Sequence, residues 1–163
     1  MSKGGENQVS FSDTKKEAIK VVEGAEGHIT LEVHRDGEVQ KLETTWFNFY
    51  IESWRTVIEA FFGEDTGVRV PAVMLLAEKA LKVGTYEIKN PFDNPPAVVA
   101  IYGKGRPGAV SGDGWGKGKL IISEVSSAPS GQSIKGSFEF LYHDAEGVLV
   151  KVVTKEFWAK NNG

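Results

Sequence analysis

Residues 102–119, YGKGRPGAVSGDGWGKGK, combine aromatic rings, cations and glycines in a pattern that suits ligand binding. Aromatic rings supply flat apolar faces, and lysine or arginine side chains beside them supply hydrogen-bond donors for a sugar ring, a lipid headgroup or an acidic protein. We therefore expect residues 103–118 to form a glycine-rich binding loop. The candidate ligand-binding residues are Trp115, Tyr102, Arg106, Lys104 and Lys117. The alternative is a solvated connection whose glycines only permit tight turns, with Trp115 folded back onto the core.

Within this stretch, residues 103–108 (GKGRPG) match the GxGxxG pattern of dinucleotide-binding proteins. That site requires a helix to begin at the motif, so that the first backbone amides face the pyrophosphate. The following residues 109–114 (AVSGDG) cannot sustain a helix. The chain also lacks the GxxxxGK[ST] pattern of a P-loop. We therefore expect no nucleotide cofactor, and no other cofactor.

Histidines and acids occur together at two turns. His34 precedes Asp36, and His143 precedes Asp144, so neighbouring hairpins would bring four potential metal ligands together. No two histidines share the local spacing of a zinc site, however, and surface turn residues are the alternative interpretation. We expect no metal site.

Support for catalysis is weak. The chain has no GxSxG motif, and Ser111, Ser123 and Ser133 have no recognisable partner in the sequence. Among 22 acidic residues, some pair suited to glycoside hydrolysis would arise by chance. The absence of cysteine excludes thiol catalysis, thiolate zinc sites and disulfides. We predict that the protein is not an enzyme and keep a small hydrolase as an alternative.

Charge and hydropathy restrict the partners. The net charge of −3 and the pI of about 5.7 lack the basic field of a nucleic-acid binder. The longest apolar run, Pro71–Ala77, is far shorter than the roughly 20 residues of a transmembrane helix. The polar first residues contain no signal-peptide core, so a cytoplasmic protein, or one released without a leader, is expected. The predicted partner is a protein, a glycan or a lipid headgroup.

Alternating apolar residues predict a mainly β domain over residues 9–160, preceded by a flexible segment 1–8. Residues 27–34 alternate and are followed by Asp36-Gly37, a strong hairpin signal, and then by a second strand over 38–50. The same design recurs later in the chain, in strands over 136–143 and 148–153 joined by the turn 144–147. Shorter apolar runs between these hairpins complete the pattern, at residues 86–88, 97–102 and 119–125. An antiparallel β-sandwich or flattened barrel of about eight to ten strands follows.

The middle of the chain allows two interpretations. Residues 53–62 have the apolar stripe of a helix, with Glu59 among the residues of its polar face, and residues 71–83 have a helical composition. The rival interpretation has strands at 56–62 and 69–76 joined by a turn. Segments this short cannot be resolved by periodicity. We favour strands, with one or two short helices in 52–83 as the alternative.

Four motifs of the second half carry a resemblance to known proteins: GTYEI (84–88), GKGKLIISEV (116–125), IKGSFEFLYHDAEG (134–147) and VTKEF (153–157). Over roughly residues 56–158 the chain resembles a group of small bacterial β-domains of unknown function. In that group a GTY turn opens a strand, and an IxGxF strand leads into the last one. The resemblance implies an all-β sandwich or barrel and assigns no catalytic residues. Many members look like exported lipoproteins, whereas this chain has no cysteine for a lipid anchor.

Together these features predict a non-catalytic binding module that uses the loops of a β-sandwich. The first alternative is a toxin-like or lectin-like protein that recognises glycans or membranes. The aromatic cluster at residues 46–50 is most simply core, although an amphipathic segment at 53–62 would allow membrane docking.

Overall fold

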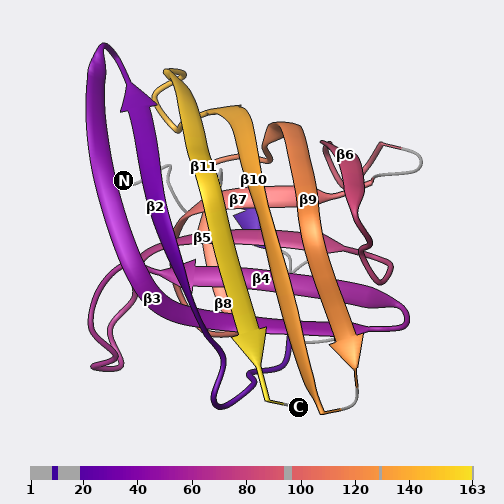
Figure 1. Cartoon of the computed structure of the whole chain (residues 1–163). Helices are drawn as coiled ribbons and strands as arrows, with labels where there is room; N and C mark the ends of the chain where they lie inside the picture. The colour runs from indigo at the N-terminus through magenta and orange to yellow at the C-terminus, as the bar shows by residue number, and fades with distance from the viewer. Residues whose placement is uncertain (1–8, 11–18, 94–96, 129, 163) are drawn as a thin grey trace.

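A computed structural model describes residues 9–10, 19–93, 97–128 and 130–162, and the predicted flexible segment 1–8 lies outside this part. The described residues are all-β, as predicted, and form one sheet of eleven strands that curls into a half-barrel (Figure 1). The strands are β1 (Val9–Ser10), β2 (Glu26–Arg35), β3 (Glu38–Glu52), β4 (Arg55–Phe61), β5 (Val70–Ala77), β6 (Gly84–Ile88), β7 (Val99–Arg106), β8 (Ala109–Gly112), β9 (Lys117–Ala128), β10 (Gly131–His143) and β11 (Leu149–Asn161). The described part of the chain contains no helix long and apolar enough to cross a membrane.

The sheet has the order β1-β8-β7-β5-β4-β3-β2-β11-β10-β9-β6, and its strand pairs are antiparallel. It folds over at β3, whose first half pairs with β2 and whose second half pairs with β4. In Figure 1, strands β2, β11, β10 and β9 therefore run across strands β4, β5 and β7 as a second layer. A strand that passes from one layer to the other is the usual corner of a crossed β-sandwich.

The predicted hairpins are confirmed. β2 alternates buried and less buried residues over Gly27–Val33, as a strand with one face on the core must. Asp36 and Gly37 both have positive φ, at 53° and 81°, as a type I′ turn requires. The second hairpin joins β10 to β11 through the predicted turn at residues 144–147.

The helical interpretation of residues 53–62 and 71–83 is wrong, and the strand interpretation is confirmed. All of β4 is buried, and so are the last six residues of β5, because these strands lie in the middle of the first layer and are covered on both faces. A strand covered on both faces is apolar throughout, so it lacks the alternation that identifies a half-exposed strand.

Two apolar clusters explain this burial. The main cluster lies between the layers and includes large side chains from both, such as Phe49, Leu75, Phe140 and Phe157. The second cluster lies on the outer face of the first layer and includes Val57, Phe61, Met74, Ile101 and, from the N-terminal segment, Ile19. The first layer is therefore packed on both faces.

The predicted glycine-rich loop 103–118 is wrong, because most of it belongs to the hairpin of β7 and β8 and to the start of β9. Gly103 shows the reason. It pairs with Gly112, and a Cβ atom at Gly103 would overlap the carbonyl oxygen of Ser111. This glycine permits close backbone approach between two strands. Among the glycines of residues 103–118, only Gly108, with φ of 86°, has the positive φ that a tight turn requires.

We expect Gly103→Ala to lower the free energy of unfolding by about 1–3 kcal/mol, the usual cost of forcing atoms into a packed site. Urea denaturation measures the change. Gly131→Ala is the matched control, because its Cβ would lie 3.4 Å from the carbonyl oxygen of Asn161, an ordinary contact. Equal losses in the two variants would contradict the close-approach explanation.

Candidate functional site

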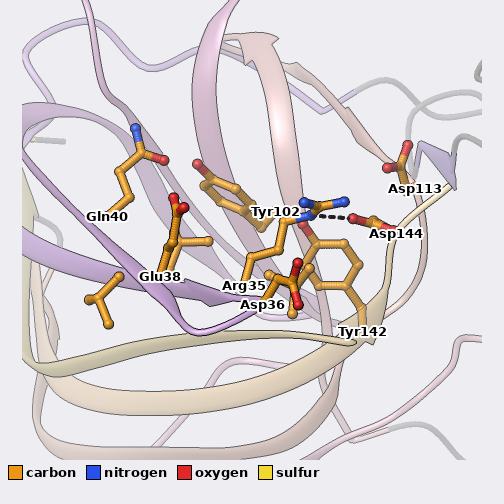
Figure 2. Close-up of a pocket in the computed structure, with 11 residues that line it drawn as sticks. Arg35, Asp36, Glu38, Gln40, Tyr102, Asp113, Tyr142 and Asp144 are labelled. Atoms are coloured by element: carbon orange, nitrogen blue, oxygen red, sulfur yellow. Dashed lines mark hydrogen bonds and ion pairs between the residues drawn. The ribbon is translucent and has the colours of Figure 1, made fainter. Parts of the chain in front are cut away.

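A pocket of about 390 Å³ opens at the end of the half-barrel where the β2–β3 and β10–β11 turns lie (Figure 2). These two turns are at the top of Figure 1. The apolar lining of the pocket includes Val33, Val39 and Val150, and its aromatic lining is Tyr102 and Tyr142. The polar residues that line it are Arg35, Asp36, Glu38, Gln40, Asp113 and Asp144. Side chains from strands far apart in sequence therefore meet in one concave site.

The tight turn of the first hairpin positions one wall of this pocket. Arg35 and Glu38 are paired across the two-residue turn at Asp36-Gly37. A type I′ turn fixes the register of the strands that it joins, and with it the side to which each flanking residue points. The turn thereby places a cation and two carboxylates at the pocket.

An ion pair connects the first hairpin to the second. The Nε atom of Arg35 lies 2.6 Å from Oδ2 of Asp144, and its Nη2 atom lies 2.8 Å from Oε1 of Glu146. The Oδ1 atom of Asp144 accepts hydrogen bonds from the backbone amides of Glu146 and Val148, at 2.9 Å each. Desolvation raises the pKa of Asp144, but these hydrogen bonds and the one from Arg35 outweigh it and lower the pKa below its ordinary value. Asp144 is therefore ionised and holds Arg35 in place.

Two tyrosines form the interior of the site (Figure 2). Tyr142 on β10 is only 8% exposed and packs in the main cluster, and Tyr102 on β7 is half-buried against the same cluster. Burial raises the pKa of both hydroxyls, and for Tyr142 the neighbouring Tyr102, Asp113 and Asp144 raise it further. Both tyrosines are therefore neutral near pH 7. No described residue makes a hydrogen bond to either hydroxyl.

Three further carboxylates, those of Asp36, Glu38 and Asp113, line the pocket without an ion pair to any described residue. Asp113 accepts a hydrogen bond of 3.0 Å from the backbone amide of Ala145, which fixes it beside the second hairpin. Asp36 acts on Arg35 through space and raises its pKa together with Asp144 and Glu146. The pocket therefore carries an excess of negative charge.

Of the five predicted binding residues, only Tyr102 lines this pocket. Trp115 is half-buried and packs against the second cluster, on the outer face of the first layer, whereas Tyr102 packs in the main cluster between the layers. Lys104, Arg106 and Lys117 are exposed. The structure therefore separates the two aromatic rings that the sequence places in one loop.

The residues of the conceivable metal site at the two turns also have other partners. Nε2 of His34 lies 3.1 Å from Oε1 of Glu32, and the carboxylate of Asp144 forms an ion pair with Arg35. Among the residues that the structure describes, no group of three or more histidines, aspartates or glutamates is arranged to hold a metal ion.

Glu59 is a second unusual group, on β4. It is 0% exposed, and its Oε1 atom accepts hydrogen bonds from Nδ2 of Asn48 at 2.8 Å and from the amide of Gly108 at 2.9 Å. Its Oε2 atom has no hydrogen-bond partner in the part of the chain that the structure describes. Desolvation raises the pKa of Glu59 to about 7, against the lowering effect of those two hydrogen bonds. Because the side chain is closed off from solvent, we assign it a structural role and not a binding role.

Sequence reasoning missed most of the pocket. Tyr142 belongs to the alternating apolar face of its strand, which marks it as a core residue, and Arg35 and Glu38 read as turn-flanking polar residues. The sequence signal that could have indicated the pocket is the pair of Asp-containing turns, because these turns belong to neighbouring hairpins. Strand order decides whether such turns meet, and here β2 pairs with β11.

Comparisons with models of protein families, with curated proteins and with solved structures found no match for this chain.

Proposed function

We propose that the protein is a non-catalytic binding module that takes a small polar ligand into the pocket between the β2–β3 and β10–β11 hairpins. The observation that carries this proposal is the hydroxyl of Tyr142. It belongs to a residue that is 8% exposed, it lines a pocket, and it has no hydrogen-bond partner among the described residues. The oxygen is open to the pocket and not enclosed by protein, so a ligand that hydrogen-bonds to it takes the place of solvent there.

The arrangement around the pocket also suits binding. Small-molecule sites are typically concave and preformed, with apolar walls and a few oriented polar groups. Here the walls are valines and tyrosine rings, and the hydrogen bonds of Asp113 and Asp144 to backbone amides fix their carboxylates before any ligand arrives. A preformed site avoids the ordering cost of a flexible loop.

Mapping of backbone amide shifts by NMR tests this function. The uniformly ¹⁵N-labelled protein is titrated with a set of fragments of similar size that includes amines, polyols and carboxylates. We expect at least one fragment to shift amides of residues 33–40, 102, 113 and 142–150 together. The proposal fails if no fragment shifts this group, or if every shift falls on residues around Trp115, where the loop hypothesis places the ligand.

A further inference from the structure

The geometry points to an organic ammonium ion with a short aliphatic chain as the ligand of the pocket between the two hairpins. This inference rests on the proposed function and adds the chemical class of the ligand. It depends on the balance of charge in the pocket, on the unpartnered hydroxyl of Tyr142, and on the apolar surface beside them.

The charges of the pocket favour a cation. Among the described residues that line it, Arg35 is the only cation, and both Asp144 and Glu146 bind its guanidinium. Its positive charge is therefore already matched inside the protein. The carboxylates of Asp36, Glu38 and Asp113 remain, and no described residue forms an ion pair with them. An anionic ligand would meet three uncompensated like charges, whereas a cation would meet opposite ones.

The hydroxyl of Tyr142 is an independent pointer to a ligand that donates hydrogen bonds. Burial raises its pKa most; Tyr102, Asp113 and Asp144 raise it further, and Arg35 lowers it, so the hydroxyl lies near two carboxylates and a cation that Asp144 and Glu146 already bind. A neutral tyrosine hydroxyl has lone pairs that can accept a hydrogen bond from an ammonium group. An ammonium group has three donors and no acceptor, so it can serve this hydroxyl and a carboxylate at once.

The remaining surface suits a hydrocarbon chain. Val33 and Val150 are buried, and Tyr102 and Tyr142 present ring surface to the pocket. Methylene groups gain from leaving water, and an ammonium held over a tyrosine ring gains a cation–π attraction. A neutral polyol would use the hydroxyls of the site but would leave the three carboxylates without a counter-charge.

Three probes with six-carbon chains separate the possible ligand classes: 1,6-diaminohexane, 1,6-hexanediol and adipate. Each is titrated into the full-length protein at pH 7 and low ionic strength, with calorimetry for affinity and amide shifts for location. We expect the diamine to shift the pocket residues and to bind at least tenfold more tightly than the diol, with no binding of adipate. Because surface charges are screened by salt, we expect the affinity of the protein for the diamine to fall as salt is added.

Conservative variants locate the effect. Glu38→Gln, Asp113→Asn and Tyr142→Phe each remove one charge or one hydroxyl and keep the shape of the side chain. Each is expected to weaken diamine binding by about three- to tenfold, the size of one ionic or hydrogen-bonded contact. Glu64→Gln is the control, because it removes the same charge from an exposed residue of the β4–β5 connection, away from the pocket.

The outcomes separate the inference from the function. If the diol or adipate shifts the pocket residues as strongly as the diamine, the ammonium class is wrong and the binding function stands. Diamine shifts scattered over surface carboxylates, equally sensitive to Glu64→Gln, would show non-specific binding and overturn the inference. If none of these probes shifts the pocket, the ammonium class is rejected. The binding function falls as well only if the wider fragment set also fails.

Discussion

Glu59→Gln is expected to make the protein more stable at pH 8.5 by about 3 kcal/mol and to change its stability little at pH 4.5. The carboxyl is buried in the outer face of the first layer beside Asn48 and Gly108, and one of its oxygens has no hydrogen-bond partner among the described residues. Burial disfavours the ionised form, so the pKa rises from the ordinary 4.5 to about 7 in the folded protein. Glutamine keeps the acceptor oxygen and cannot ionise.

The direction of the pH effect follows from this rise. Below pH 4.5 the carboxyl is protonated in both the folded and the unfolded chain, and the wild type is at no disadvantage. As pH increases from 4.5 to about 7, the unfolded chain releases the proton more readily, so the wild type loses stability; above pH 7 the loss is complete. The difference between the wild type and Glu59→Gln should therefore grow across this window.

Urea denaturation at pH 4.5, 6 and 8.5 measures the difference. Glu64→Gln changes an exposed glutamate of the β4–β5 connection and should show no comparable dependence on pH. A stability difference between the wild type and Glu59→Gln that is the same at all three values would contradict the buried ionisation.

Asn48→Ala is expected to destabilise the protein by about 2–4 kcal/mol, because it leaves several buried or half-buried polar groups without partners. The Asn48 side chain is 1% exposed and joins the N-terminal segment to β4. Its Oδ1 atom accepts a hydrogen bond from the amide of Val22 at 2.8 Å, and its Nδ2 atom donates to the carbonyl of Lys20 and to Glu59, at 2.8 Å each. One amide thus attaches residues 19–22 to the outer face of the first layer.

Amide hydrogen exchange provides the specific readout for Asn48→Ala. Exchange at Val22 should accelerate much more than exchange in β10 or β11, which lie in the other layer. Asn90→Ala is the matched control, because the side chain of Asn90 accepts a single exposed hydrogen bond from the described residues, from the amide of Phe92 at 2.9 Å. Equal losses of stability in the two variants, with unchanged exchange at Val22, would show that Asn48 does not hold the segment.

The hairpins were predictable because their signals are local. Asp36-Gly37 requires positive φ at two successive residues, and few turns other than type I′ satisfy that. Alternation along β2 and β10 fixes which face is buried, since the period of a strand is two residues.

Other features depend on contacts that local pattern cannot contain. Glycine marks either a turn or a close approach, and only the neighbouring strand shows that Gly103 is the second kind. In the helical interpretation Glu59 lies on a polar face, but in the strand it lies in the buried outer face of a covered layer. The pocket arises because β2 pairs with β11, which no short window of sequence reveals.

A crystal structure of the protein grown with 1,6-diaminohexane tests the central claim most directly. We predict that the diamine lies in the pocket between Tyr102 and Tyr142, with one nitrogen about 3 Å from the hydroxyl of Tyr142. A diamine bound beside Trp115 on the opposite face of the first layer, with the pocket free of it, would contradict the account.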